Sequence, residues 1–185
     1  MRLRPPAQRC RCGYVGYRIG DSTQPQRGCG SGDKPHASIA LSRLIHLVFS
    51  TKERRPFLQD ETIRESLHAY LGGISKHLGC PPVIVGGVDD HVHLLGRFSR
   101  TITQAEWVKE LKRVSNLWLK EKYLLRDFEW QDGYADFSVS PSNLEQVKRY
   151  IANQPGHHRK MNFQDELRAL LQRHATEWDE RYLWD

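Results

Sequence analysis

The sequence predicts an α+β fold: a ferredoxin-like split βαβ antiparallel sheet with helices on one face and added C-terminal helices. Two observations predict it. Strand-like and helix-like segments follow one another in the order β-α-β-β-α-β, which is the order of the split βαβ unit, and two further helical segments come after them. The sequence contains no internal repeat, so we expect a single sheet rather than a repeat array.

Apolar patterns mark the first four elements. Residues 42–51 are an apolar run that ends in charged residues, as a buried strand does. Residues 61–78 carry apolar side chains at helical spacing, and Gly79, with two prolines close behind it, ends this helix. Residues 83–88 and 91–98 are β-prone runs separated by a tight turn of two aspartates, so we expect them to form a hairpin.

The next elements begin with recognisable helix signals. Thr103 and Glu106 form a capping box, which opens a helix that runs to about Lys122. A loop follows, with a possible short strand at residues 128–130, and residues 135–140 are the fourth strand of the predicted sheet.

The C-terminal region is predicted to be helical. Ser142 and Glu145, after Pro141, have the spacing of a second capping box, and Pro155-Gly156 should end or bend the helix that they open. Residues 163–173 form a last helix. The aromatic tail after it, with Trp178, Tyr182 and Trp184, offers apolar area for docking on the core or on a partner.

Composition divides the chain into two parts. Residues 1–37 are rich in Arg, Gly, Pro, Gln and Ser without an apolar period, so we expect a disordered basic extension, or sequence translated from a start codon set too early. Residues 38–185 are long enough for one domain with a core. No stretch approaches the roughly 18 apolar residues of a membrane span, and the N-terminus lacks the apolar region of a secretory signal. We therefore expect a cytoplasmic protein without a membrane partner.

The cysteines do not predict a zinc site. Three of the four lie in the N-terminal extension, at Cys10, Cys12 and Cys29, with His36 nearby. Their spacing differs from the paired C-x2-C pattern of zinc knuckles. Cys80 is expected to be a small buried residue.

The net charge of +6 belongs mostly to the extension. Residues 1–37 hold seven Lys and Arg against two Asp and Glu, whereas residues 38–185 hold 21 against 20. Any affinity of the domain for DNA must therefore come from local basic clusters. The alternative for each cluster is a solvated surface. The candidate DNA-binding residues are Lys52, Arg54, Arg55, Lys109, Lys112, Arg113, Lys148 and Arg149.

The motif His91-Val92-His93 carries the strongest chemical signal. Alternate side chains of a strand share a face, so both imidazoles point the same way. Two adjacent imidazoles make up two-thirds of a divalent-metal site. The alternative is a structural role, because H-x-H also occurs by chance.

Tyr150 and Gln154 extend this hypothesis. They lie four residues apart, on one face of a predicted helix. The Gln154 carbonyl oxygen can complete an N,N,O site suited to Mg²⁺ or Mn²⁺, and the Tyr150 phenolate is a competent nucleophile towards a phosphodiester. The alternatives are a core or interface tyrosine and a helix-end glutamine that bonds a backbone carbonyl.

These motifs together resemble the HUH transposases with a single catalytic tyrosine, namely the insertion-sequence 200/605 group and the REP-associated tyrosine transposases. H-V-H followed by Y-I-A-N-Q carries the resemblance. The segments LIHLVFSTKERRPFL, VGGVDDHVHLLGRF, WVKELKRVSNLWLK and GYADFSVS agree with it in order. The resemblance covers residues 41–185.

The resemblance implies a role for each of these residues. His91, His93 and Gln154 match the family's metal ligands, and Tyr150 matches its nucleophile. The family cuts and rejoins single-stranded DNA at hairpin ends without ATP, through a 5′-phosphotyrosine. It acts as a homodimer with composite sites, in which the tyrosine helix of one subunit completes the His pair of the other. The resemblance assigns no role to Asp90, and its place beside His91 leaves two, orienting an imidazole or capping the turn.

Two other functions remain open from the residues alone. A ferredoxin-like sheet can bind single-stranded DNA or RNA without chemistry, although the predicted strands here are mostly aliphatic. A zinc hydrolase built on His91 and His93 would need a further His or carboxylate ligand, and only Asp89 or Asp90 offers one by its spacing. His157 and His158 follow the Pro-Gly break, so we expect them at the surface or in contact with phosphate.

Overall fold

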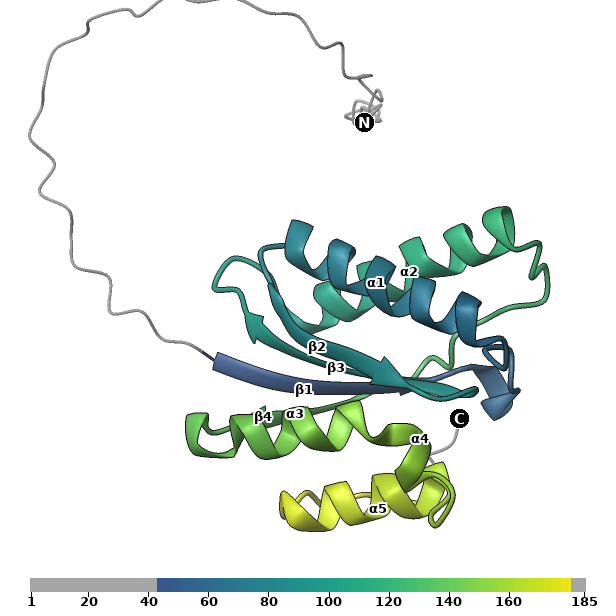
Figure 1. Cartoon of the computed structure of the whole chain (residues 1–185). Helices are drawn as coiled ribbons and strands as arrows, with labels where there is room; N and C mark the ends of the chain where they lie inside the picture. The colour runs from purple at the N-terminus through teal and green to yellow at the C-terminus, as the bar shows by residue number, and fades with distance from the viewer. Residues whose placement is uncertain (1–42, 181–185) are drawn as a thin grey trace, which may run out of the picture. The chain divides into compact units, whose positions relative to one another are not determined.

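A computed structural model describes residues 43–180, which form a four-stranded antiparallel sheet with helices on both faces (Figure 1). The strands are β1 (Arg43–Ser50), β2 (Pro82–Gly87), β3 (His91–Phe98) and β4 (Ala135–Val139), in the spatial order β2-β3-β1-β4. This order confirms the predicted ferredoxin-like split βαβ sheet. The expectations for residues 1–37, for Tyr182 and for Trp184 lie outside the described residues.

The two central strands, β1 and β3, are covered by helices on both faces. Almost every residue of β1, and the first six residues of β3, are buried. Strands that are buried on both faces read as continuous apolar runs, which is why β1 was recognisable in the sequence. Its side chains alternate. Leu47 and Phe49 pack in the core below α1 (Glu61–His77) and α2 (Gln104–Lys122), whereas Val48 packs in a second cluster with α5 (Phe163–Arg173).

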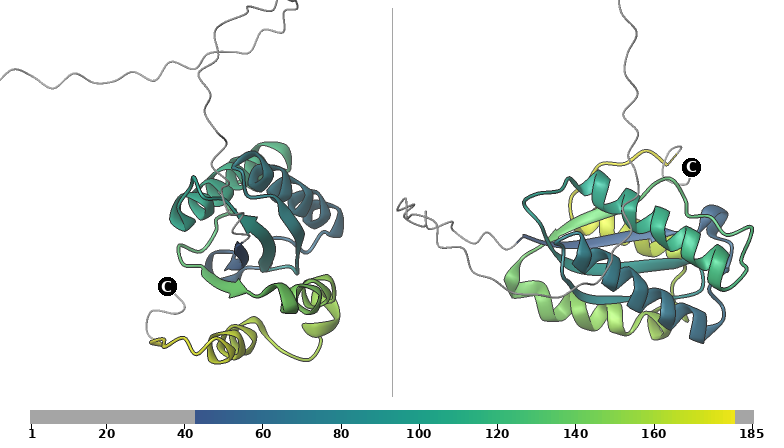
Figure 2. Two further views of the ribbon diagram at one scale, coloured as in Figure 1. Left: turned by 90° about the vertical axis from the view of Figure 1, so that its left-hand side faces the viewer. Right: turned by 90° about the horizontal axis from the view of Figure 1, so that it is seen from above.

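The first two helices begin as their sequences predict. The Asp60 side chain accepts hydrogen bonds from the backbone N–H groups of Thr62 and Ile63 and so caps α1. Thr103 and Glu106 form the predicted capping box of α2. Both helices lie on the same face of the sheet, and the left-hand view of Figure 2 shows them together above the strands. No helix between residues 43 and 180 combines the length and hydrophobicity needed to cross a bilayer.

The C-terminal helices cover the opposite face of the sheet, so that the described domain has helices on both faces (Figures 1 and 2). They are α3 (Leu144–Ala152), the single turn α4 (Gln154–His157) and α5. Trp178, in the tail after α5, packs against the cluster that α5 forms with the sheet. The sequence left open whether Trp178 docks on the core or on a partner, and in the structure it packs on the core of its own chain.

Three local predictions were wrong. The second capping box does not form, because Pro141–Asn143 is a 3₁₀ turn (η2) and neither Ser140 nor Asn143 caps it or α3 with its side chain. The possible strand at residues 128–130 is a single bridge between Thr51 and Trp130. The helix after η2 breaks at Asn153, two residues before Pro155, where the break was expected, so Tyr150 and Gln154 lie on different helices.

Helix α3 approaches the sheet closely at a glycine. A Cβ on Gly86 of β2 would lie 2.8 Å from both the carbonyl oxygen and the Cγ2 of Ile151. Real Cβ atoms essentially never come that close, so only glycine permits this contact. The contact fixes the height of α3 above the sheet and, with it, the position of Tyr150 one residue earlier.

Candidate active site

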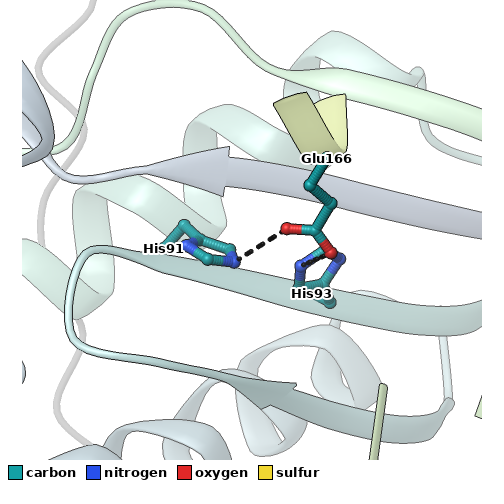
Figure 3. Close-up of side chains that lie close together, drawn as sticks. All are labelled: His91, His93 and Glu166. Carbon is teal, nitrogen blue, oxygen red and sulfur yellow. Dashed lines mark ion pairs between the residues drawn. The ribbon is translucent and has the colours of Figure 1, made fainter. Parts of the chain in front are cut away.

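His91 and His93 point to the same face of the sheet, as their alternation on β3 predicts. Both side chains are fully buried beneath the C-terminal helices, whereas Val92 packs in the core on the other face. Figure 3 shows the two imidazoles side by side, with a carboxylate from α5 facing them.

Each imidazole is held through its Nδ1 atom. His91 Nδ1 lies 2.6 Å from Asp90 Oδ1, and His93 Nδ1 lies 2.9 Å from Nε2 of His46, a buried residue of β1. These bonds direct Nε2 of both rings towards one point. Histidines that bind metals are oriented in the same way, by a partner on the second ring nitrogen. Asp90 thus orients an imidazole, one of the two roles considered for it, whereas sequence reasoning did not identify His46.

Glu166 of α5 occupies the point to which the imidazoles are directed. Its Oε2 atom lies 3.4 Å from His91 Nε2, and its Oε1 atom lies 3.5 Å from His93 Nε2 (Figure 3). Sequence reasoning missed this residue, although a signal was present. Glu166 falls on the apolar face of α5, among Phe163, Leu167 and Leu170, and a buried carboxylate there requires partners.

Tyr150 and Gln154 meet at the same carboxylate. The Tyr150 hydroxyl donates a hydrogen bond to Glu166 Oε1, and Gln154 Nε2 donates another over 2.8 Å. The Gln154 carbonyl oxygen lies 3.4 Å from His91 Nε2. The centroid of the Tyr150 ring is 5.8 Å from that of His93. All four residues named from the sequence therefore converge within one chain, although they come from three separate elements.

His157 and His158 also turn inwards, contrary to the expected surface position. His158 Nε2 lies 2.8 Å from Glu166 Oε2, and His157 Nε2 lies 3.7 Å from Glu166 Oε1. The short helix α4, which begins where α3 breaks, brings both rings back over the site. The break at Asn153 thus supplies two more imidazoles to the carboxylate.

The charges of the site depend strongly on one another. Although burial opposes its ionisation, the imidazoles of His158, His91 and His93 hold the pKa of Glu166 well below its ordinary value. Burial also opposes the charged form of His91, but Asp90 and Glu166 raise its pKa to about 9. Burial lowers the pKa of His93 to about 4. A charged His91 next to the Glu166 carboxylate is therefore the favoured state of the metal-free site at neutral pH.

Tyr150 is held in its neutral form. Its burial and the negative charge of Glu166 both raise the pKa of the phenol far above the ordinary value. A tyrosine in this position becomes a nucleophile only when its proton has an acceptor or when the charge beside it is neutralised.

His91, His93 and Glu166 fit a divalent metal ion. Ligand atoms of the three residues lie within 4.8 Å of one another, and all three side chains are buried. His93 Nε2 makes no hydrogen bond with the described residues, and its contact in the site is the 3.5 Å ion pair with Glu166 Oε1. The zinc-hydrolase alternative needed a third ligand beside the two histidines. Glu166, which the spacing of the sequence did not reveal, is such a ligand.

The basic cluster of α2 does not lie at this site. Lys109, Lys112 and Arg113 belong to α2, on the opposite face of the sheet (Figure 1). The Lys112 ammonium donates to three backbone carbonyls, those of Gln131, Asp132 and Gly133, and burial lowers its pKa to about 8. Lys112 thus fixes a loop, and it would have to leave these carbonyls to bind a phosphate.

The other candidate cations have partners on the surface. Lys52 pairs with Glu129 at 3.3 Å, and Arg113 pairs with Glu110 at 2.7 Å. On α3, Lys148 lies 3.8 Å from Glu145, and Arg149 Nε donates to the Glu145 carbonyl. The Arg55 guanidinium lies over the Phe57 ring, and Arg54, in the same turn, also has a partner. Exposed pairs of this kind contribute little to stability and can open, so a role in DNA binding remains a prediction.

Comparison with known proteins gives one family and two structures. The family described as "Transposase IS200 like" matches residues 41–154. A candidate transposase from Deinococcus radiodurans R1 is 27% identical, with a TM-score of 0.48, over 66% of this chain and 98% of that one. A REP-associated tyrosine transposase bound to a REP hairpin is 12% identical, with a TM-score of 0.50, over 68% of this chain and 74% of that one, a likeness of fold. No curated protein matches.

Proposed function

Because the chain belongs to the IS200-like transposase family, we propose that it cuts and rejoins single-stranded DNA through a covalent 5′-phosphotyrosine at Tyr150. One observation carries the proposal. The Tyr150 hydroxyl, Nε2 of both histidines and the Glu166 carboxylate converge on one buried point. The convergence of a phenol with two imidazoles and a carboxylate is the set of groups that metal-assisted attack on a phosphodiester requires.

Tyr150 acts as the nucleophile, and Glu166 Oε1 orients its hydroxyl by accepting the hydrogen bond. The phenolic oxygen forms a bond to phosphorus, the bond from phosphorus to the 3′ oxygen breaks, and the departing 3′ oxygen takes up a proton from water. The phenolic proton leaves to water, because a carboxylate whose pKa is held well below its ordinary value is a weak base. Rejoining is the reverse reaction with another 3′-OH, so no ATP is needed.

His91, His93 and Glu166 would hold Mg²⁺ or Mn²⁺, with the Gln154 carbonyl oxygen as a further ligand. The bound ion would polarise the scissile phosphate and stabilise the charge that develops on it. Asp90 and His46 keep the two imidazoles turned towards it. A zinc hydrolase keeps an open position for a water molecule at its metal. Here the Tyr150 hydroxyl lies at the carboxylate instead, so we favour Mg²⁺ or Mn²⁺.

The proposed substrate is single-stranded DNA with hairpin ends. The REP-associated relative is bound to a REP hairpin, and the sequence resemblance implies the same class of ligand. A homodimer is proposed on the same ground. In the single chain, Tyr150 bonds the carboxylate that faces its own His pair, so the composite arrangement that the resemblance implies stays a prediction to be tested with mixed subunits.

The proposal is tested by looking for the covalent intermediate. Labelled single-stranded element ends are incubated with the protein and Mg²⁺, and a protein–DNA adduct that protease destroys is expected on a denaturing gel. Tyr150→Phe should abolish the adduct while DNA binding stays nearly unchanged, because only the hydroxyl is lost. Glu166→Gln should slow adduct formation strongly, because it replaces a charged metal ligand with a neutral amide.

Two controls make the result decisive. Glu145→Gln removes an exposed carboxylate from α3 and should leave the adduct unchanged. Undiminished adduct in Tyr150→Phe would refute the nucleophile. Tight DNA binding without any adduct, in the presence of Mg²⁺ or Mn²⁺, would favour the alternative of a non-catalytic binding module.

A further inference from the structure

A pocket of about 490 Å³ lies beside Tyr150, and the proposed chemistry does not use it. It is bounded by β4, an edge strand of the sheet, by α3 and by the C-terminal end of α5. The two helices cover the same face of the sheet (Figure 1). Tyr150 and His46 line the pocket and belong to the active site as well. A molecule bound there would therefore touch the nucleophile. Pockets of roughly 300–1,000 Å³ are the usual size for small organic ligands.

Arg173 supplies a positive charge to this pocket. It lies in the last turn of α5, and its guanidinium makes no hydrogen bond or ion pair with any residue between 43 and 180. Its charge also acts on the phenol, because it works to lower the pKa of Tyr150 against the effect of Glu166. An unpaired guanidinium that lines the same pocket as a nucleophile is suited to a phosphate, which it can bind through two parallel hydrogen bonds.

His174 supplies a flat surface next to that charge. Its ring stacks on Phe137 of β4, with 4.7 Å between centroids and an interplanar angle of 28°. Phe137 is buried, whereas His174 is exposed. Burial and the charge of Arg173 lower the pKa of His174, so the ring is neutral at neutral pH. A neutral aromatic ring supported from below is a platform on which an unpaired base can stack.

The remaining wall of the pocket is polar. Asn143 and Gln146 contribute side-chain amides, and Ser138 and Ser140 contribute hydroxyls. These groups both donate and accept hydrogen bonds, as the edges of a nucleobase require. The pocket is thus lined by a cation, by a stacking platform and by amides, and the nucleophile Tyr150 lies in its wall.

We propose that this pocket binds one unpaired nucleotide adjoining the scissile phosphate, with Arg173 on a phosphate and His174 beneath the base. The inference rests on the proposed function for the identity of the scissile phosphate. The pocket itself is tested by DNA binding without metal, so that its failure can be told apart from a failure of the chemistry.

The probes are fluorescein-labelled oligo-dT and an abasic strand of the same length, and the measurement is fluorescence anisotropy. His174→Ala should weaken the binding of oligo-dT about tenfold and leave the abasic strand unaffected, because only a base can stack. Arg173→Gln should weaken both strands equally and reduce the salt dependence of log K by roughly 0.7, the value for one phosphate contact on a single strand.

Three further variants keep the test sharp. His174→Phe preserves a flat ring and should restore the affinity for oligo-dT. Arg97→Gln removes an exposed charge at the far end of β3 and is the charge-matched control for Arg173. Gln172→Ala, an exposed change on α5, controls for disturbance of the helix.

The proposal is overturned if His174→Ala affects both strands alike or neither. It is also overturned if Arg173→Gln weakens binding no more than Arg97→Gln does. A normal pattern of binding together with no covalent adduct in the presence of Mg²⁺ would instead refute the proposed chemistry and leave the nucleotide pocket standing.

Discussion

The protonation of His91 should set how the stability of the metal-free protein depends on pH. Its pKa is raised to about 9 in the folded protein, against about 6.5 when unfolded. A raised pKa gives stability that is complete below pH 6.5 and is lost as the pH rises through 9. We expect the free energy of unfolding in EDTA to fall by up to about 3 kcal/mol over that range.

The measurement is denaturant unfolding across pH 6 to 9.5, in which the linear dependence on denaturant concentration gives the free energy of unfolding. Asp90→Asn should flatten the decline, because Asp90 is one of the two groups that hold the proton. Below about pH 6.5 stability should fall again, since burial lowers the pKa values of His46 and His93 and both must then be protonated on unfolding. Unchanged stability from pH 6.5 to 9 would contradict the charged His91.

His46 should act as a positioning residue for the metal. Its Nε2 atom bonds Nδ1 of His93 at 2.9 Å, so His46→Ala frees the His93 ring to turn and leaves its Nδ1 without a partner. Losing such a partner typically weakens metal binding about 10- to 100-fold. Titration with Mn²⁺, followed by the spin-resonance signal of the free ion, measures this directly. His77→Ala, an exposed change at the end of α1, is the control, and equal affinities would show that His46 only fills space.

Sequence reasoning found the residues whose pattern is local and missed those whose roles depend on contacts distant along the chain. The His91–His93 pair was visible because alternation on a strand is local. His46 and Glu166 lie 47 and 12 residues from the groups they bond, His93 and Gln154. Their roles depend on strand register and on the placement of α5, which no local pattern specifies. Only the conflict of a carboxylate on an apolar helix face indicated Glu166.

At the scale of elements, Gly86 should determine whether α3 places Tyr150 correctly. A Cβ at this position would lie 2.8 Å from Ile151, so Gly86→Ala should push α3 away from β2. A misplacement of about 1 Å at a reacting group can cost on the order of 100-fold in rate. Adduct formation should therefore fall to that extent, whereas Mn²⁺ binding should change little because His91 and His93 do not lie on α3.

Gly73→Ala is the matched control, because a Cβ there meets nothing within 4 Å. It lies within α1, where alanine is favoured over glycine by roughly 1 kcal/mol, so this variant should unfold at a slightly higher temperature and form the adduct normally. A Gly86→Ala protein with a normal rate would show that α3 tolerates the displacement.

The boundaries of the elements followed from the sequence wherever a cap or a break was local. The bounds of β3 and α5 agree with the prediction, and the capping box of α2 is present. The break at Asn153 was not foreseen, because the signal chosen was Pro155, which instead lies in the first turn of α4. Proline is tolerated in a first turn, where its missing N–H has no partner to lose. That single turn carries Gln154 to the carboxylate.

At the scale of the whole molecule, the sheet order and its helix layers were predictable from the order of segments. The C-terminal helices were predicted as additions, but their face was not. It follows from the apolar stripe of α5 meeting Val48 and Phe137, which the pleat directs away from α1 and α2. Because the helices cover that face, the residues at the start of β3 and those of α3 meet within one chain.

Mixing two inactive variants should therefore fail to restore activity. Tyr150→Phe and His91→Ala subunits, joined in a heterodimer that is purified through two different tags, carry one defect in each site if every chain uses its own tyrosine. The structure predicts this result, because the Tyr150 hydroxyl bonds the carboxylate that faces the His pair of the same chain. Adduct formation is measured as before. In a composite arrangement one site would carry both defects and the other would be intact, so a clear recovery of adduct would show that α3 exchanges between subunits.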